Sequence, residues 1–83
     1  MLKSNLLSNN NWVVGNNSLT MTEPTVSGYS VFMPITCHMW TGGPFFFKGI
    51  TSNGTNWIVT YYNNGPATTT SIGIDCYWLM IKS

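Results

Sequence analysis

The sequence predicts an all-β domain, and three observations support this prediction. No apolar stripe recurs at every third or fourth residue, and no long run of strong helix formers occurs. β-Branched and aromatic residues dominate the apolar segments, which favours strands. Turn signals rich in Gly, Pro and Asn divide the chain at regular intervals. We therefore expect short antiparallel strands in a sandwich or a β-prism-like knob.

The first part of the chain is the least regular. Residues 1–11 are rich in Asn and Ser, and we interpret them as a linker that precedes a single domain over 12–83. Residues 12–14 and 18–22 have the character of two short strands around the turn Gly15-Asn16-Asn17. Together they predict a hairpin.

The segment 29–40 is the clearest long strand, because apolar side chains alternate along it. The residues expected to share its apolar face are Val31, Met33, Ile35, Cys37 and Met39. Pro34 has no N–H to donate to a neighbouring strand. We therefore expect a bulge at Pro34 or a position at the edge of a sheet.

Four further strands are expected between turns, at 45–50, 57–62, 67–72 and 74–82. Asn53-Gly54 is a strong hairpin signal, because both residue types tolerate positive φ. The last strand is apolar on both of its faces. It should be buried on both sides, by a second sheet or by a neighbouring subunit.

The composition is unusual for a small domain. Charged residues make up 6% of the 83 residues, against about 25% in an ordinary soluble domain, while 43% are hydrophobic. Polarity comes instead from 10 Asn, 11 Thr, 8 Ser and 8 Gly. A small monomer of this kind would expose sticky apolar surface, because few charges are available to cover it. We therefore expect a homo-oligomer.

Charge and hydropathy argue against several classes of function. The chain has no Arg and only three Lys, so no cationic stripe can neutralise phosphates, and nucleic-acid binding is not expected. No apolar run approaches the ~20 residues that span a bilayer, and no signal-peptide layout is present at the N-terminus. We expect no membrane insertion and no classical secretion.

The residues that usually carry catalysis are scarce. Glu23 and Asp75 are the only carboxylates, and Cys37 and His38 are neighbours that point to opposite faces of a strand. Zinc-type ligand spacing is absent. We expect no enzymatic activity, no metal and no cofactor. Cys37 and Cys76 are either bridged or free, and their apolar surroundings favour two buried thiols.

Recognition of a ligand is the remaining class of function. Trp and Tyr beside Asn in loops offer flat apolar faces together with neutral donors and acceptors, a combination suited to sugar rings and their hydroxyls. The candidate ligand-binding residues are Trp40, Trp57, Tyr61, Tyr62, Asn63 and Asn64. The alternative reading is that Trp57 and either tyrosine are ordinary core residues.

The chain is poor in charge, rich in Asn, Thr, Ser and Gly, carries Trp and Tyr, and has a final strand expected at 74–82. In these features it resembles the C-terminal tip of a bacteriophage tail fibre or receptor-binding protein. The resemblance implies a homotrimer in the virion, made in the host cytoplasm, with residues 1–11 as the stub of a shaft. It implies binding to a bacterial surface glycan or outer-membrane protein. The rival hypothesis is a structural virion protein, a capsid decoration or tail-assembly component, whose aromatic residues serve subunit contacts.

Overall fold

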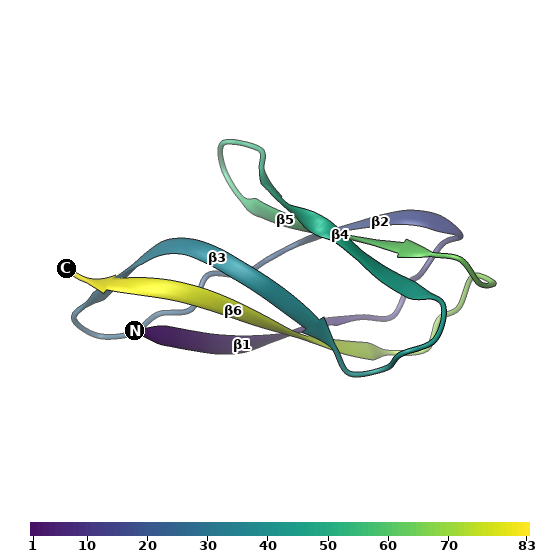
Figure 1. Ribbon diagram of the computed structural model, residues 1–83, viewed down its shortest axis with the longest axis horizontal. Coiled ribbons are helices and arrows are strands. Elements are labelled where there is room, and N and C mark those ends of the chain that lie inside the picture. The colour runs from purple at the N-terminus through teal and green to yellow at the C-terminus, as the bar shows by residue number, and fades with distance from the viewer.

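A computed structural model describes all of residues 1–83 as two antiparallel three-stranded sheets with no helix, which confirms the all-β prediction. The first sheet has the strand order β1-β6-β3, and the second has the order β2-β5-β4. The strands are β1 (Leu2–Asn9), β2 (Gly15–Thr20), β3 (Tyr29–Met39), β4 (Phe45–Ser52), β5 (Trp57–Asn63) and β6 (Ile72–Lys82). Figure 1 shows the two sheets as separate layers, with both chain ends at one end of the first sheet.

One hydrophobic core lies between the two layers, and the central strand of each sheet supplies most of it. On β6, alternate residues from Ile72 to Met80 are buried, and Ile74 and Trp78 are fully buried. On β5, Val59 and Tyr61 are buried in the same cluster. The alternation of period two therefore places one face of each central strand against the opposite sheet, as in a sandwich.

Residues 1–11 are not a linker, which corrects the expectation from their Asn-rich composition. Residues 2–9 form β1 and pair with β6 along their whole length. Three of the four inward positions of β1 carry Lys3, Asn5 and Asn9, and only Leu7 adds an apolar contact with the core. The apolar alternation that marks a strand is therefore missing from this segment.

The predicted hairpin of 12–14 with 18–22 is also wrong. Trp12 instead makes an isolated two-bond bridge with Thr68, and β2 pairs with β5. Asn17, expected in a turn, is a buried strand residue whose side chain bonds the N–H and C=O of Val13. Long-range pairing overrides the local turn signal here. The expected strand at 67–72 is reduced to the bridge at Thr68 and the first residue of β6.

β3 has the bulge expected at Pro34 and also lies at a sheet edge, next to β6. A second register shift falls between Val31 and Met33. Each bulge inserts one residue and reverses the facing of the side chains that follow. Met33 and Ile35 are consequently exposed, while Pro34 and Cys37 are buried, so the predicted five-residue apolar face is wrong.

The other strand predictions fare better. The β4–β5 hairpin turns at Asn53-Gly54, where Gly54 has a φ of 91° and the Asn53 side chain accepts the N–H groups of Thr55 and Asn56. β6 is covered on its inner face by the second sheet. Its outer face, with Tyr77 and Leu79, is only half-buried, so the expected burial on both sides is found on one side within a single chain.

Candidate functional site

A hollow of about 340 Å³ opens where β2 ends and β5 begins, beside the β4–β5 turn. Figure 1 shows these strand ends and the turn. Its lining residues are Thr20, Met21, Thr22, Glu23, Thr55, Asn56 and Trp57. They come from two segments that are far apart in the sequence. The pairing of β2 with β5 brings these segments together.

The floor and walls of the hollow are held by backbone structure. Met21 N–H donates to the carbonyl of Trp57 at 2.8 Å, which extends the β2–β5 pairing by one residue, and the Met21 side chain is buried. On the opposite wall, the Asn53 side chain orders the turn that carries Thr55 and Asn56. Strands and an ordered turn therefore position the lining groups before any ligand arrives.

One rim of the hollow is tied to the first sheet. The carbonyl of Thr22 accepts a hydrogen bond of 2.6 Å from the Asn5 side-chain amide of β1. Asn5 in turn accepts a hydrogen bond from the indole N–H of Trp78 at 2.8 Å. A short chain of hydrogen bonds thus connects the fully buried Trp78 to the segment that carries Glu23.

The chemistry of the hollow combines one aromatic ring, one carboxylate and several neutral polar groups. Trp57 is half-buried, while Glu23, Asn56 and the three threonines are exposed. No Lys or His lines the hollow. The site can therefore offer an apolar ring face, a strong hydrogen-bond acceptor at Glu23, and amide and hydroxyl groups.

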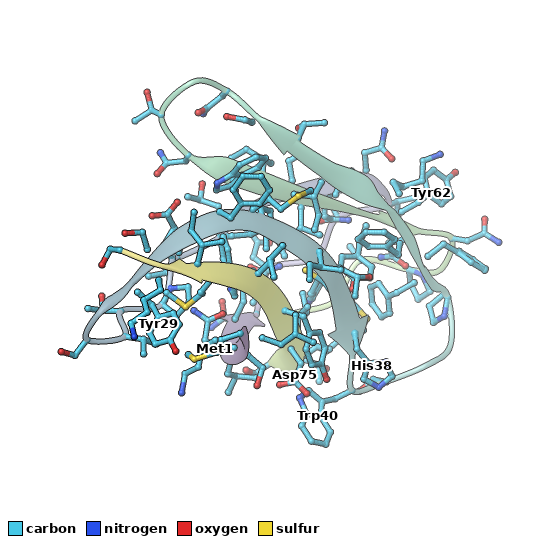
Figure 2. All side chains as sticks on the ribbon, turned by 60° about the vertical axis from the view of Figure 1, so that its left-hand side comes forward. Met1, Tyr29, His38, Trp40, Tyr62 and Asp75 are labelled. Atoms are coloured by element: carbon cyan, nitrogen blue, oxygen red, sulfur yellow. The ribbon has the colours of Figure 1, made fainter.

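Of the six residues expected to bind a ligand, only Trp57 lines this hollow. Trp40 is 67% exposed just after β3, where its indole packs with Leu6 over Gly73 on the outer side of the first sheet. Tyr62 is 38% exposed on the outer side of the second sheet, with the Lys48 ammonium 5.9 Å from its ring centroid. Figure 2 shows Trp40 beside His38 and Asp75, well separated from Tyr62. These residues do not form one site.

Tyr61 and Asn63 are buried, which corrects their placement at a binding surface. Both lie on the inward face of the central strand β5. The Asn63 amide donates to the carbonyls of Val13 and Pro66, and its oxygen accepts the N–H of Gly65. Asn63 is thus a structural residue that holds together the β1–β2 and β5–β6 connections.

The Tyr61 ring packs edge-on against Phe47, with ring centroids 5.7 Å apart. Its hydroxyl is buried and has no hydrogen-bond partner. Burial raises the pKa of this hydroxyl, and negative charge on Cys37 and Cys76 raises it further. The remaining candidate, Asn64, is exposed, and its backbone N–H donates to the carbonyl of Pro44.

Sequence reasoning missed Glu23 and Asn56 as members of a shared site. Both have turn-like surroundings, beside Pro24 and Gly54 respectively, and nothing local indicates that the two turns meet. The signal would have been the correct pairing partner of β2. The turn residues at 15–17 predict a local hairpin for residues 18–22, so the sequence does not indicate that partner.

A second hollow of about 380 Å³ surrounds the bridge between Trp12 and Thr68. Trp12 is 1% exposed and its indole N–H already donates to the carbonyl of Asn9, so the ring is not presented to a ligand. The hollow holds no titratable side chain. It is a weaker candidate than the hollow at Trp57.

The structure brings together no group of three or more His, Cys, Asp and Glu side chains. His38 and Asp75 are directly opposite each other on β3 and β6, but neither lines a hollow, and Glu23 lies elsewhere. No helix is present that could cross a bilayer.

Comparison with known proteins finds no match: no family model fits the chain, and no curated protein and no solved structure is significantly similar to it. The chemistry of the hollow is therefore the basis for the function proposed below.

Proposed function

We propose that this protein is a non-enzymatic adhesion module that binds a cell-surface glycan in the hollow at Trp57. The observation that carries the proposal is the meeting of the Trp57 ring, the Glu23 carboxylate and the Asn56 amide in one hollow. Sugars present apolar ring faces and hydroxyl edges. An aromatic ring can stack on the former, while a carboxylate and an amide bind the latter.

The charge of the hollow selects among sugars. Glu23 accepts hydroxyl donors with a charge-assisted bond, and such bonds are about twice as strong as neutral ones. The lining contains no cation to offset the charge of an acidic sugar. The ligand class is therefore a neutral sugar, and an acidic sugar should be repelled by Glu23.

The setting we propose is the tip of a bacteriophage tail fibre, where the partner is a bacterial surface glycan or, as the alternative, an outer-membrane protein. Composition supports this setting: the chain is poor in charge and rich in Asn, Thr, Ser and Gly. The module would be made in the host cytoplasm and would act in the virion. Strand ends and an ordered turn hold part of the lining in place, which suits adhesion because little ordering entropy is lost on binding.

The proposed assembly is a homotrimer that uses the outer face of the first sheet. We define this face by its apolar side chains: Leu2, Leu6, Met33, Trp40, Tyr77, Leu79 and Ile81. Leu2 and Leu6 are 67% and 63% exposed, and Asp75 is the one carboxylate or amine along the face. A second copy of this chain, itself poor in charge, is the occupant that such a surface fits.

The same face favours the second candidate function, a structural virion component. Trp40 lies on it together with Leu6, so its exposed ring is placed for subunit contact as well as for a receptor. In a capsid decoration or tail-assembly protein, assembly alone would be the function. The hollow at Trp57 would then bind no sugar.

The test compares two matched changes of carboxylate to amide. Glu23→Gln alters the hollow, and Asp75→Asn makes the same change at the only other carboxylate, outside the hollow. A panel of neutral and acidic sugars is first screened against the wild type by glycan array. Affinity for a neutral hit should then fall about tenfold or more in Glu23→Gln, as expected for loss of a hydrogen bond to a charged group.

Asp75→Asn should bind the same sugar as the wild type does. Equal losses in the two variants, or a wild type that prefers acidic sugars, would contradict the site. A wild type that assembles but binds no sugar on the array would favour the structural candidate.

A further inference from the structure

The two cysteines lie directly opposite each other in the first sheet. Cys37 of the edge strand β3 is the register partner of Cys76 on the central strand β6. Both side chains point into the core, and both are free thiols, 8% and 1% exposed. In the sequence they are far apart, so only strand pairing brings them together.

The spacing of the two strands suits a bond between the sulfur atoms. Directly opposite residues in an antiparallel pair have Cα atoms ~4.5–5.5 Å apart, within the ~4.4–6.8 Å that a disulfide requires. Their Cβ atoms lie ~4.5–5.5 Å apart, whereas a disulfide prefers ~3.5–4.5 Å. Closing the bond therefore requires an approach of about 1 Å or less.

The structure allows β3 to make that approach. β3 is paired on one side only, and a bulge falls between Pro34 and Thr36, immediately before Cys37. A bulge interrupts the ladder and permits a local bend. β6, by contrast, is held between two strands and can serve as the fixed partner.

The thiols also influence each other's protonation. A side-chain hydrogen bond from Cys37 lowers the pKa of Cys76, and the same bond, together with burial, raises the pKa of Cys37. The thiolate is the nucleophile in thiol–disulfide exchange, so the lowered pKa of Cys76 favours exchange at this pair.

We propose that Cys37 and Cys76 are a covalent modification site, at which a low-molecular-weight disulfide such as oxidised glutathione converts the two thiols into a cross-strand disulfide. One of the two protein thiolates attacks one sulfur of the oxidant, forms a mixed disulfide and releases the first small thiolate, which takes up a proton. The other cysteine then gives up its proton, its sulfur attacks the protein sulfur of the mixed disulfide, and the second small thiol leaves. Two protein thiols are oxidised, and one small disulfide is reduced to two thiols.

The new bond would cross-link two strands of the first sheet and close a ring of chain that includes part of the second sheet. Residues 38–75, which lie inside the closed ring, contain the whole of β4 and β5. Cross-linking a loop of this length restricts the unfolded chain and stabilises the fold. An excess of the reduced small thiol drives the same exchange backwards, so the site can act reversibly.

The test uses the wild-type chain and does not depend on sugar binding. The chain is refolded from denaturant with reduced and then with oxidised glutathione, and intact mass is measured without reductant. The expected product is a monomeric chain that has lost two hydrogen atoms, carries no glutathione and resists alkylation. Its melting temperature should rise by at least about 5 °C over that of the reduced chain.

Trypsin then locates the bond, because Lys48 is the only cleavage site between the two cysteines. Peptides 4–48 and 49–82 should migrate as one species until a reductant is added. The matched control, Cys76→Ser, should remain alkylatable at Cys37 or retain glutathione. Retained glutathione on the wild type, bonds only between chains, thiols that stay free after refolding, or an oxidised monomer that melts below the reduced chain would each overturn the proposal.

Discussion

The indole N–H of Trp78 donates a hydrogen bond of 2.8 Å to the side-chain oxygen of Asn5, which joins the buried centre of β6 to the edge strand β1. The same Asn5 side chain donates from its nitrogen to the carbonyl of Thr22 at the rim of the hollow. One amide therefore satisfies a buried donor and anchors the loop that carries Glu23. This explains why a segment with few apolar residues still belongs to the fold.

Asn5→Ala should destabilise the domain by ~1–3 kcal/mol, because the buried indole N–H of Trp78 would lose its partner. Urea denaturation followed by Trp fluorescence measures the change. The control is Asn10→Ala, at an exposed asparagine just outside β1. If both variants unfold at the same urea concentration as the wild type, the bond between Asn5 and Trp78 contributes nothing to stability.

Asn63→Asp should be strongly destabilising, by ~2–4 kcal/mol at neutral pH. The side-chain amide that donates to the carbonyls of Val13 and Pro66 would be replaced by a buried carboxylate that repels them. Asn64→Asp makes the same change at an exposed neighbour and should shift stability by less than about 0.5 kcal/mol. Thermal melts of the two variants separate the effects. Similar losses of stability in both variants would show that the buried hydrogen bonds of Asn63 do not stabilise the fold.

Tyr61→Phe should leave the fold intact and stabilise it by about 1 kcal/mol at neutral pH, because it removes a buried hydroxyl that has no hydrogen-bond partner. Tyr62→Phe, at an exposed tyrosine, is the control and should be close to neutral. Chemical denaturation of both variants tests the difference. A marked loss of stability in Tyr61→Phe would mean that the hydroxyl is satisfied after all.

The same residue predicts a pH dependence. The pKa of Tyr61 is raised in the folded state, first by burial, so the fold favours its protonated form. Above about pH 10 the unfolded chain releases this proton while the folded chain keeps it. The free energy of unfolding should therefore fall as pH rises beyond that value. Denaturation measured from pH 8 to pH 11 should show a smaller fall for Tyr61→Phe than for the wild type.

Leu6→Lys should lower the solution mass if the outer face of the first sheet joins subunits. Leu6 packs with Trp40 over Gly73, and a lysine there would place a charge inside the interface. Val14→Lys is the matched control, since Val14 is 64% exposed against 63% for Leu6 but lies outside that face. Light scattering should give about three chains for the wild type and the control and fewer for Leu6→Lys. A monomeric wild type would remove the trimer proposal.

The central strands could be predicted from local sequence, while the edges could not. β5 and β6 are rich in β-branched and aromatic residues, and Asn53-Gly54 determines a hairpin through its backbone preferences alone. β1 carries Lys3 and Asn5 on its inward face, so its place in the sheet depends on partners far away in the sequence. Bulges in β3 likewise reversed the facing of Met33, which no alternation rule anticipates.

The candidate site also combines residues that local sequence could predict with residues that only long-range pairing brings together. Trp57 was identified because an aromatic residue beside an Asn-Gly turn is a local feature. Tyr and Asn beside a turn predict exposure, but Tyr61 and Asn63 lie on the face of the central strand β5 that packs against the other sheet, so both are buried. The sequence shows that the two residues share a face, because they are two positions apart. Which face meets the core is known only once both sheets are assembled.

The sequence by itself determined the all-β class, the scarcity of charge and the turn at Asn53-Gly54, since these depend on composition and on residues that are neighbours in the chain. Tertiary structure alone decided that Glu23 meets Trp57, that Cys37 faces Cys76 and that Asn5 reaches Trp78. Each of these pairs is separated by more than thirty residues. Their proximity comes from which strands pair, and that choice is made by burial of the shared core rather than by any local signal.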